Sequence, residues 1–133
     1  MSAVTRIWLR VFAALLATAP LAACNSNADL NPTAATKGSQ IGDVAAGKAA
    51  IERVGCGACH VIPGITAAVG MVGPPLDHIG SRQYLAGMLH NTPESMITWL
   101  RFPQRIVPGN AMPDMGLSET EARNIAAYLE TLK

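Results

Sequence analysis

The chain has 133 residues, of which 50% are hydrophobic and 14% are charged, and its 10 Lys and Arg are nearly balanced by 9 Asp and Glu. This length fits one small globular domain, and the balance of charge argues against a nucleic-acid-binding protein or a disordered chain. Trp8 and Phe12 lie in an N-terminal segment that we expect to be removed, so few rings remain for a core. Small domains with thin cores usually contain disulfides, metals or another filler.

Residues 1–23 have the pattern of a secretory signal peptide. Arg6 and Arg10 precede an apolar run that continues to Ala23, and a basic start followed by a short apolar stretch is typical of such signals. The alternative is a membrane-spanning helix, which needs about 20 apolar residues. Arg10 and Pro20 interrupt the run, so we favour a cleaved signal.

The apolar run ends in Leu21-Ala22-Ala23-Cys24, which resembles the lipoprotein box of bacteria. In such a box the cysteine becomes the first mature residue and carries lipid. The alternative is ordinary cleavage that leaves an idle thiol at Cys24. Because Cys24 ends the box and a polar segment follows it, we predict a lipoprotein held at the periplasmic side of a bacterial membrane.

Residues 24–41 predict a flexible tether between this anchor and the folded domain. They are rich in small and polar side chains and show neither helical nor strand periodicity. A flexible chain of this length has a root-mean-square reach of about 20 to 25 Å. The domain, predicted at residues 42–133, could therefore move over the membrane surface.

The first predicted helix covers about residues 43–54. Small or apolar side chains recur there at helical spacing, at Val44, Gly47, Ile51 and Val54. Gly47 leaves room for a second helix to approach closely.

The segment Cys56-Gly57-Ala58-Cys59-His60 carries the chemistry of the chain. Cys-x-x-Cys-His is the attachment signal for a c-type haem. Two thiols at this spacing add across the two vinyl groups of one porphyrin edge, and the next residue lies under the iron. We therefore predict one covalent haem c, with His60 as the proximal iron ligand. The haem would also complete the thin core.

Three other interpretations of the two cysteines are a redox dithiol, half of a zinc site and a structural disulfide. A zinc site needs four ligands, and no second Cys pair is present. A thioredoxin-like dithiol would need a βαβ context, which the sequence does not suggest.

Helices are also predicted in the C-terminal half of the chain. A short one is expected near Ser81 and should carry Tyr84 and Leu85. Thr92-Pro93-Glu94 combines an N-cap, a first-turn proline and a first-turn acid, and predicts a helix that ends before Pro103. No stretch alternates like a strand for long.

The last helix is predicted from a capping box at Ser118-Glu119-Thr120-Glu121. One apolar stripe follows the box, at Ala122, Ile125, Leu129 and Leu132.

Residues 42–133, about two thirds of the chain, resemble a class I c-type cytochrome with one haem. The similar landmarks occur in the family's order, at Gly42 to Lys48, Gly73-Pro74-Pro75-Leu76, Arg82, Pro103 to Met112, and Ile125 to Leu129. The resemblance implies an all-α fold of three to four helices around the haem. It also implies that the first and last helices cross, with Gly47 and Ile51 meeting Ile125 and Tyr128.

The sixth iron ligand has four candidates: Met112, Met115, His78 and His90. Thioether is a weak ligand that needs a loop to hold it, and Met112 lies nine residues after Pro103, the interval that the family shows. Met112 is therefore preferred over Met115, and lone histidines in polar loops are usually solvated. The remaining methionines are assigned to core or loop packing: Met71, Met88 and Met96.

The resemblance implies further roles around the haem. The carbonyl of Pro74 should accept the second ring N–H of His60 and orient the ring. Arg82 should pair with a haem propionate, with an ordinary surface arginine as the alternative. Trp99 is expected near the Met ligand, and plain core packing would explain it almost as well.

An iron with both axial positions filled leaves no open site for a substrate, which favours a one-electron carrier over an enzyme. The sequence is especially similar to cytochrome c domains associated with subunit II of bacterial haem-copper oxidases. We therefore expect a monomer that passes electrons to a redox protein in a periplasmic respiratory chain, such as a terminal oxidase. The alternatives are the electron-accepting subunit of a periplasmic dehydrogenase, and a haem sensor or small peroxidase.

Overall fold

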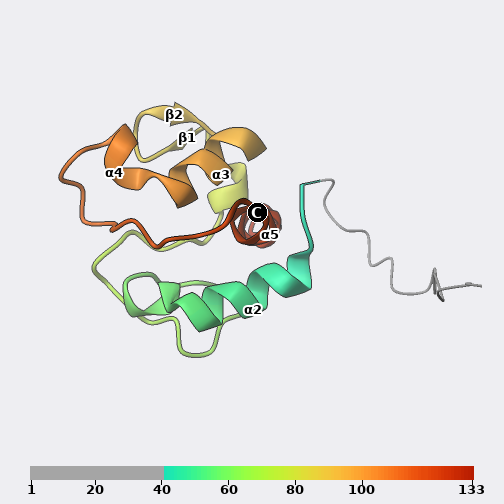
Figure 1. The fold of residues 1–133 in the computed structure, drawn as a ribbon. Coiled ribbons are helices and arrows are strands. Elements are labelled where there is room, and N and C mark those ends of the chain that lie inside the picture. The colour runs from blue at the N-terminus through green and yellow to red at the C-terminus, as the bar shows by residue number, and fades with distance from the viewer. Residues whose placement is uncertain (1–40) are drawn as a thin grey trace, which may run out of the picture. The chain divides into compact units, whose positions relative to one another are not determined.

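A computed structural model describes residues 41–133 of the chain. The predicted signal peptide, the predicted lipid site Cys24 and the tether up to residue 40 lie outside this part. The elements that follow one another along the described chain (Figure 1) are α2 (Val44–Val54), η2 (Cys56–Ala58), η3 (Ile79–Ser81), β1 (Tyr84–Leu85), β2 (Leu89–His90), α3 (Pro93–Arg101), α4 (Pro103–Ile106) and α5 (Glu119–Glu130). Within residues 41–133, no helix combines the length and apolar character needed to cross a membrane.

Helix α2 confirms the first predicted helix. The Asp43 side chain caps it by accepting a hydrogen bond from the backbone N–H of Ala46 at 2.8 Å. It ends at Gly55, whose φ of 85° is left-handed and suits a glycine. Ile41, the last residue of the predicted tether, is partly buried and packs against the core.

Helices α3 and α5 are confirmed with the caps that the sequence indicates. The Thr92 side chain accepts a hydrogen bond from the backbone N–H of Ser95 at the start of α3. At the start of α5, Ser118 and Glu121 form a complete capping box. The single turn α4 separates from α3 at Phe102 because Pro103 cannot donate the hydrogen bond that would continue the helix.

The helix predicted near Ser81 is wrong. The short 3₁₀ turn η3 ends at Ser81, and Tyr84 and Leu85 form strand β1, which pairs antiparallel with β2. Ala86 and Gly87 have φ values of 50° and 70°, and this left-handed backbone reverses the chain where a right-handed helix would have continued it. Within residues 41–133 the fold is mostly helical and includes one two-stranded hairpin.

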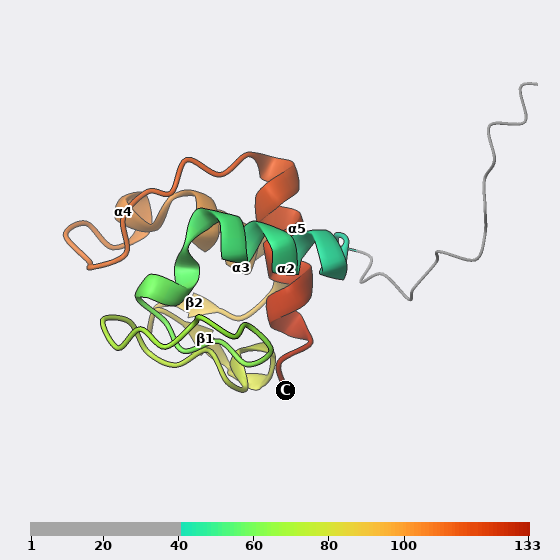
Figure 2. The same ribbon diagram turned by 90° about the horizontal axis from the view of Figure 1, so that it is seen from below.

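Helices α2 and α5 cross, and the crossing depends on Gly47. Figure 2 shows α2 lying across α5. A Cβ atom at position 47 would lie 1.9 Å from the carbonyl oxygen of Asn124 and 3.1 Å from Cβ of Tyr128. The Asn124 side chain also accepts a hydrogen bond from the backbone N–H of Asp43 at 2.9 Å. The expected crossing is confirmed, with backbone and not side chain at the closest approach.

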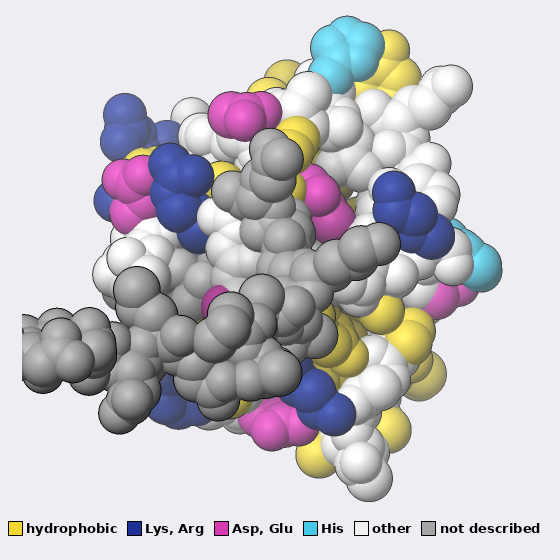
Figure 3. Space-filling view, turned by 90° about the vertical axis from the view of Figure 1, so that its right-hand side faces the viewer, with side chains coloured by type: hydrophobic (Ala, Val, Ile, Leu, Met, Phe, Trp, Pro, Cys, Tyr) yellow, Lys and Arg dark blue, Asp and Glu magenta, His cyan; other side chains and the backbone are white. Residues whose placement is uncertain are grey.

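Basic and acidic side chains are interspersed on the surface, and several are paired. Arg53 pairs with Glu121, and Glu119 bonds Arg123 at 2.8 Å and lies 3.6 Å from Arg101. Figure 3 shows Lys and Arg beside Asp and Glu on the face that it draws. The opposite charges of these pairs partly cancel each other.

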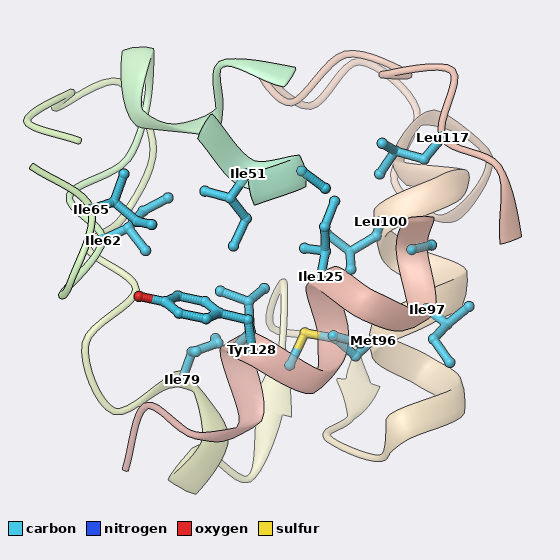
Figure 4. Packing of buried hydrophobic residues seen from close by; sticks show 14 of the residues in the cluster. Ile51, Ile62, Ile65, Ile79, Met96, Ile97, Leu100, Leu117, Ile125 and Tyr128 are labelled. Atoms are coloured by element: carbon cyan, nitrogen blue, oxygen red, sulfur yellow. The ribbon is translucent and has the colours of Figure 1, made fainter. Parts of the chain in front are cut away.

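The core is mostly aliphatic (Figure 4). It contains Ile51, Met96 and Ile125, each about 1% exposed, and Tyr128, at 8% exposed, is the only buried aromatic side chain among the described residues. The Tyr128 hydroxyl donates a hydrogen bond to the carbonyl of Pro63 at 2.7 Å. Because Tyr84 is 48% exposed, the protein's own rings fill little of the interior.

Candidate functional site

A cavity of about 550 Å³ opens between the segment after α2, helix α3 and the loop before α5. This volume is within the usual range for cofactor sites, about 300 to 1,000 Å³. Most of the lining side chains are apolar, and Arg82 is the only charged residue among them. The residues predicted for the site from the sequence all line this one cavity: Cys56, Cys59, His60, Pro74, Arg82, Trp99 and Met112.

The two cysteines lie on one wall because the chain turns tightly after α2. In this turn the backbone N–H groups of Cys59 and His60 both donate to the carbonyl of Cys56, at 3.2 and 3.1 Å. The two cysteines are free thiols in the structure and form no disulfide. Burial is the main cause that raises the pKa of the Cys56 thiol. Reactive redox cysteines need a lowered pKa, so this environment disfavours the dithiol interpretation.

The ring of His60 is held by the loop that follows it. Its Nδ1 lies 2.7 Å from the carbonyl oxygen of Pro74. A carbonyl only accepts, so Nδ1 donates its proton, and in the neutral imidazole this leaves the lone pair on Nε2 of a ring that lines the cavity. Gly73 allows this approach, because a Cβ there would lie 2.3 Å from Cε1 of His60. The contact gives His60 the form in which imidazole binds a metal.

Met112 lies on the loop between α4 and α5 and is half-buried. Its backbone N–H donates to Oδ1 of Asn110 at 2.7 Å, and its carbonyl accepts from Nε2 of Gln104 at 2.7 Å. Met115 also lines the cavity, so it remains a second sulfur within the site. Neither His78 nor His90 is among the described residues that line it.

Arg82 is fixed at the cavity wall by backbone contacts. Its guanidinium donates to the carbonyls of Pro75 and Asp77, at 2.6 and 2.9 Å, and lies 3.7 Å from the Asp77 carboxylate. Trp99 on α3 lines the same cavity. One anchored cation at the edge of an apolar cavity matches a ligand that is apolar over most of its surface and acidic at one side.

The structure identifies a surface next to the site that sequence reasoning missed. Residues 61–76 contain no charged side chain, and Val69, Met71 and Val72 are 74%, 90% and 69% exposed. Val72 also lines the cavity. The packing role assigned to Met71 and Met88 is wrong because both are exposed, whereas Met96 is in the core. A long uncharged run after the cysteine motif is the signal that could have revealed this surface.

The donor set fits an iron porphyrin. Two thiols at the attachment spacing, one imidazole with Nε2 free and thioether sulfur all line one apolar cavity, and a single guanidinium meets its edge. Sulfur and imidazole are the ligands that haem iron takes in electron carriers.

Comparisons with known proteins agree with this assignment. The family model "Cytochrome c" matches residues 44–133. The chain is 35% identical over 88 residues to cytochrome c oxidase subunit 2 of Alkalihalophilus pseudofirmus, and the match covers 65% of this chain and 25% of that protein. It is 32% identical over 88 residues to cytochrome c oxidase subunit 2 of Bacillus sp. (strain PS3), covering 63% of this chain and again 25% of the relative.

A third relative, cytochrome c2 of Agrobacterium tumefaciens, is 35% identical over 104 residues, covering 66% of this chain and 90% of the relative. The chain thus spans about a quarter of the length of the oxidase subunits and most of the length of the small cytochrome.

Proposed function

The chain belongs to the cytochrome c family, carries one covalently bound haem c and is a haem-based electron carrier. From this premise we propose which residues hold the haem and which partner the protein serves. Cys56 and Cys59 would hold the haem covalently through their sulfur atoms, and His60 and Met112 would hold its iron. The observation that carries the assignment is that all four residues line one cavity.

When bound, the haem would supply the one-electron redox chemistry of its iron. The protein orients the iron ligands and excludes water from the haem. Pro74 orients His60 and strengthens its donation to iron, and apolar side chains such as Met96 and Leu100 keep solvent from the centre. With His60 and Met112 both holding the iron, no position would be open to a substrate, which supports an electron carrier over an enzyme.

Arg82 is proposed to meet a haem propionate. It is the one charged residue of the described cavity lining, and its contacts to Pro75 and Asp77 already hold the guanidinium in place. Trp99 is proposed to pack near Met112.

Met112, not Met115, is proposed as the sulfur ligand because its backbone is held on both sides, by Asn110 and by Gln104. A Met-ligated ferric iron has a weak absorption band in the far red. Met112→Ala should abolish this band and lower the midpoint potential, while Met115→Leu should leave both unchanged. Loss of the band in Met115→Leu, with Met112→Ala retaining it, would reverse the assignment.

The proposed partner is a membrane-bound terminal oxidase. Two relatives are oxidase subunits that contain a similar segment, and this supports a carrier that delivers electrons in a periplasmic respiratory chain. We place the protein on the periplasmic side of a bacterial membrane, anchored by lipid on Cys24.

Encounter with this partner is proposed to depend on the anchor and not on charge. Removal of Arg6 and Arg10 with the signal leaves 8 basic residues against 9 acidic ones, and a weak net charge gives little long-range steering. A tether raises the local concentration near a membrane-bound partner, and the exposed Val69, Met71 and Val72 offer an uncharged contact beside the cavity.

Stopped-flow oxidation in membranes that contain the oxidase tests the proposal across a salt series. The lipidated protein should react at a rate that changes little with ionic strength, and Cys24→Ala should be much slower. A steep salt dependence with no effect of Cys24→Ala would contradict it. Mass spectrometry of the mature N-terminus checks the lipid directly.

A further inference from the structure

We propose that Gln104 is a positioning residue that keeps the Met112 loop closed over the haem iron. The inference rests on the proposed role of Met112 as iron ligand. Gln104 lies on the single turn α4 and is not among the residues that line the cavity. Its effect on the iron must therefore pass through the loop.

The side-chain amide of Gln104 makes three hydrogen bonds to this loop. Its Nε2 donates to the carbonyl of Met112 at 2.7 Å and to the carbonyl of Asn110 at 2.9 Å. Its Oε1 accepts from the backbone N–H of Gly109 at 3.1 Å. Three backbone groups of a four-residue stretch, 109–112, are thus bound by one side chain.

Asn110 completes the arrangement from within the loop. Its Nδ2 donates to the carbonyls of Pro103 and Val107, at 3.0 and 2.6 Å, and its Oδ1 accepts from the backbone N–H of Met112 at 2.7 Å. The N–H of Met112 is therefore held by Asn110 and its carbonyl by Gln104. Because Asn110 also lines the cavity, Gln104 is the member of the pair that can be changed without altering the cavity wall.

The loop needs such contacts because it has no regular secondary structure between α4 and α5. Loops with few backbone hydrogen bonds open locally more easily than helices. A thioether is a weak iron ligand, so an external ligand competes whenever the loop releases Met112. The two bonds from Nε2 shift this equilibrium toward the closed loop by about tenfold, which corresponds to about 0.7 kcal/mol per bond and lies in the lower part of the range for ordinary hydrogen bonds.

Gln104 holds the loop through the hydrogen bonds that its amide donates, and not through charge or size. The amide is uncharged, and its two donor bonds are the ones that reach past Gly109 to Asn110 and Met112. A carboxylate of the same size could still accept from Gly109 but could not donate to either carbonyl. Replacement by glutamate therefore separates donation from the mere presence of a side chain.

The test uses the ferric holoprotein and imidazole as a competing iron ligand. Gln104→Leu and Gln104→Glu should each bind imidazole about tenfold more tightly than the unaltered protein, while the far-red band persists without imidazole. Gln83→Leu is the matched control, since Gln83 is exposed beside the hairpin, and its imidazole affinity should not change. Unchanged affinity in both Gln104 variants would overturn the proposal.

Two further measurements keep the test decisive. If Gln104→Leu gives little holoprotein, amide hydrogen exchange at Met112 in Gln104→Glu should still be about tenfold faster than in the unaltered protein, and equal exchange would overturn the proposal. Met112→Ala separates the two hypotheses. If the far-red band survives in Met112→Ala, the ligand assignment is wrong. If Met112→Ala loses the band but the Gln104 variants keep their imidazole affinity, only the role of Gln104 is wrong.

Discussion

The crossed helices α2 and α5 and the two loops that wall the cavity are held together in different ways. The helices meet backbone to backbone at Gly47 and bury Ile51 and Ile125 almost completely. The loops, at 61–76 and 107–117, lack α-helix and paired strands, apart from one bridge between Val61 and Val69. The helices are stabilised by contacts within the protein, while the loops enclose an apolar space that the protein does not fill.

Loss of haem attachment should have the largest effect, because it empties the region that the loops enclose. An empty apolar cavity costs about 24 cal/mol per Å³, and over about 550 Å³ this is comparable, before any collapse, with the whole stability of a small domain, about 5 to 15 kcal/mol. His60→Ala and the double variant Cys56→Ser/Cys59→Ser should therefore yield no stable holoprotein. A denaturing gel stained for haem peroxidase activity measures it, and stain equal to the unaltered protein in the double variant would contradict covalent attachment.

A change at the crossing point tests the helices alone. Gly47→Val would place Cβ 1.9 Å from the carbonyl oxygen of Asn124, and a backbone clash of this kind should lower the free energy of unfolding by about 3 kcal/mol. Thermal unfolding of the holoprotein measures the loss. Ala49→Val, at an exposed position of the same helix, is the control for helix propensity and should lose less than about 1 kcal/mol. Equal losses would mean that the crossing tolerates the added volume.

A substitution in the loop at 61–76 should alter the haem site more than it alters the crossed helices. Gly73→Ala would place Cβ 2.3 Å from Cε1 of His60, so the ring must move away from Pro74, at a cost of about 1 to 3 kcal/mol. We expect less holoprotein and a shifted midpoint potential, with the helical circular dichroism of the purified holoprotein unchanged. Ala67→Val, exposed in the same loop, should leave the potential unchanged. A normal potential in Gly73→Ala would show that the ring does not need this approach.

The smallest effect is expected from pH, through the cap of α5. The hydrogen bonds from Ser118, more than the nearby Arg53, lower the pKa of Glu121 below its ordinary value. A carboxyl whose folded pKa is lowered contributes stability above its unfolded pKa and loses that contribution as the pH falls through the folded value. Glu121→Gln should therefore be slightly less stable at pH 7 and lose less stability on acidification to about pH 3.

Denaturant unfolding of the two proteins at both pH values measures this difference. Burial raises the pKa of Glu130, so Glu130→Gln should show the opposite trend, with a relative gain as the pH rises. A steeper acid loss in Glu121→Gln than in the unaltered protein would contradict the role of the cap.

The elements that the sequence predicted well depend on rules that act within a few residues. The Thr92 cap, the Ser118 capping box and the spacing of apolar side chains determine α2, α3 and α5 locally. The attachment motif is local too, because the thiol spacing must match one porphyrin edge. These features could be predicted without knowledge of the fold.

Three features could not be predicted from such local rules: the hairpin at Tyr84 to His90, the exposure of Met71 and the amide contacts of Gln104. Each depends on contacts with residues whose types give no distinctive signal in the sequence. Positive φ at Ala86 turns a segment that otherwise resembles a short helix. Gln104 is one of many polar residues until α4 places its amide against the carbonyl of Met112. Local preferences set where helices start and end, but a side chain's environment depends on which distant segment packs beside it, and that follows only from how the whole chain closes around the cavity.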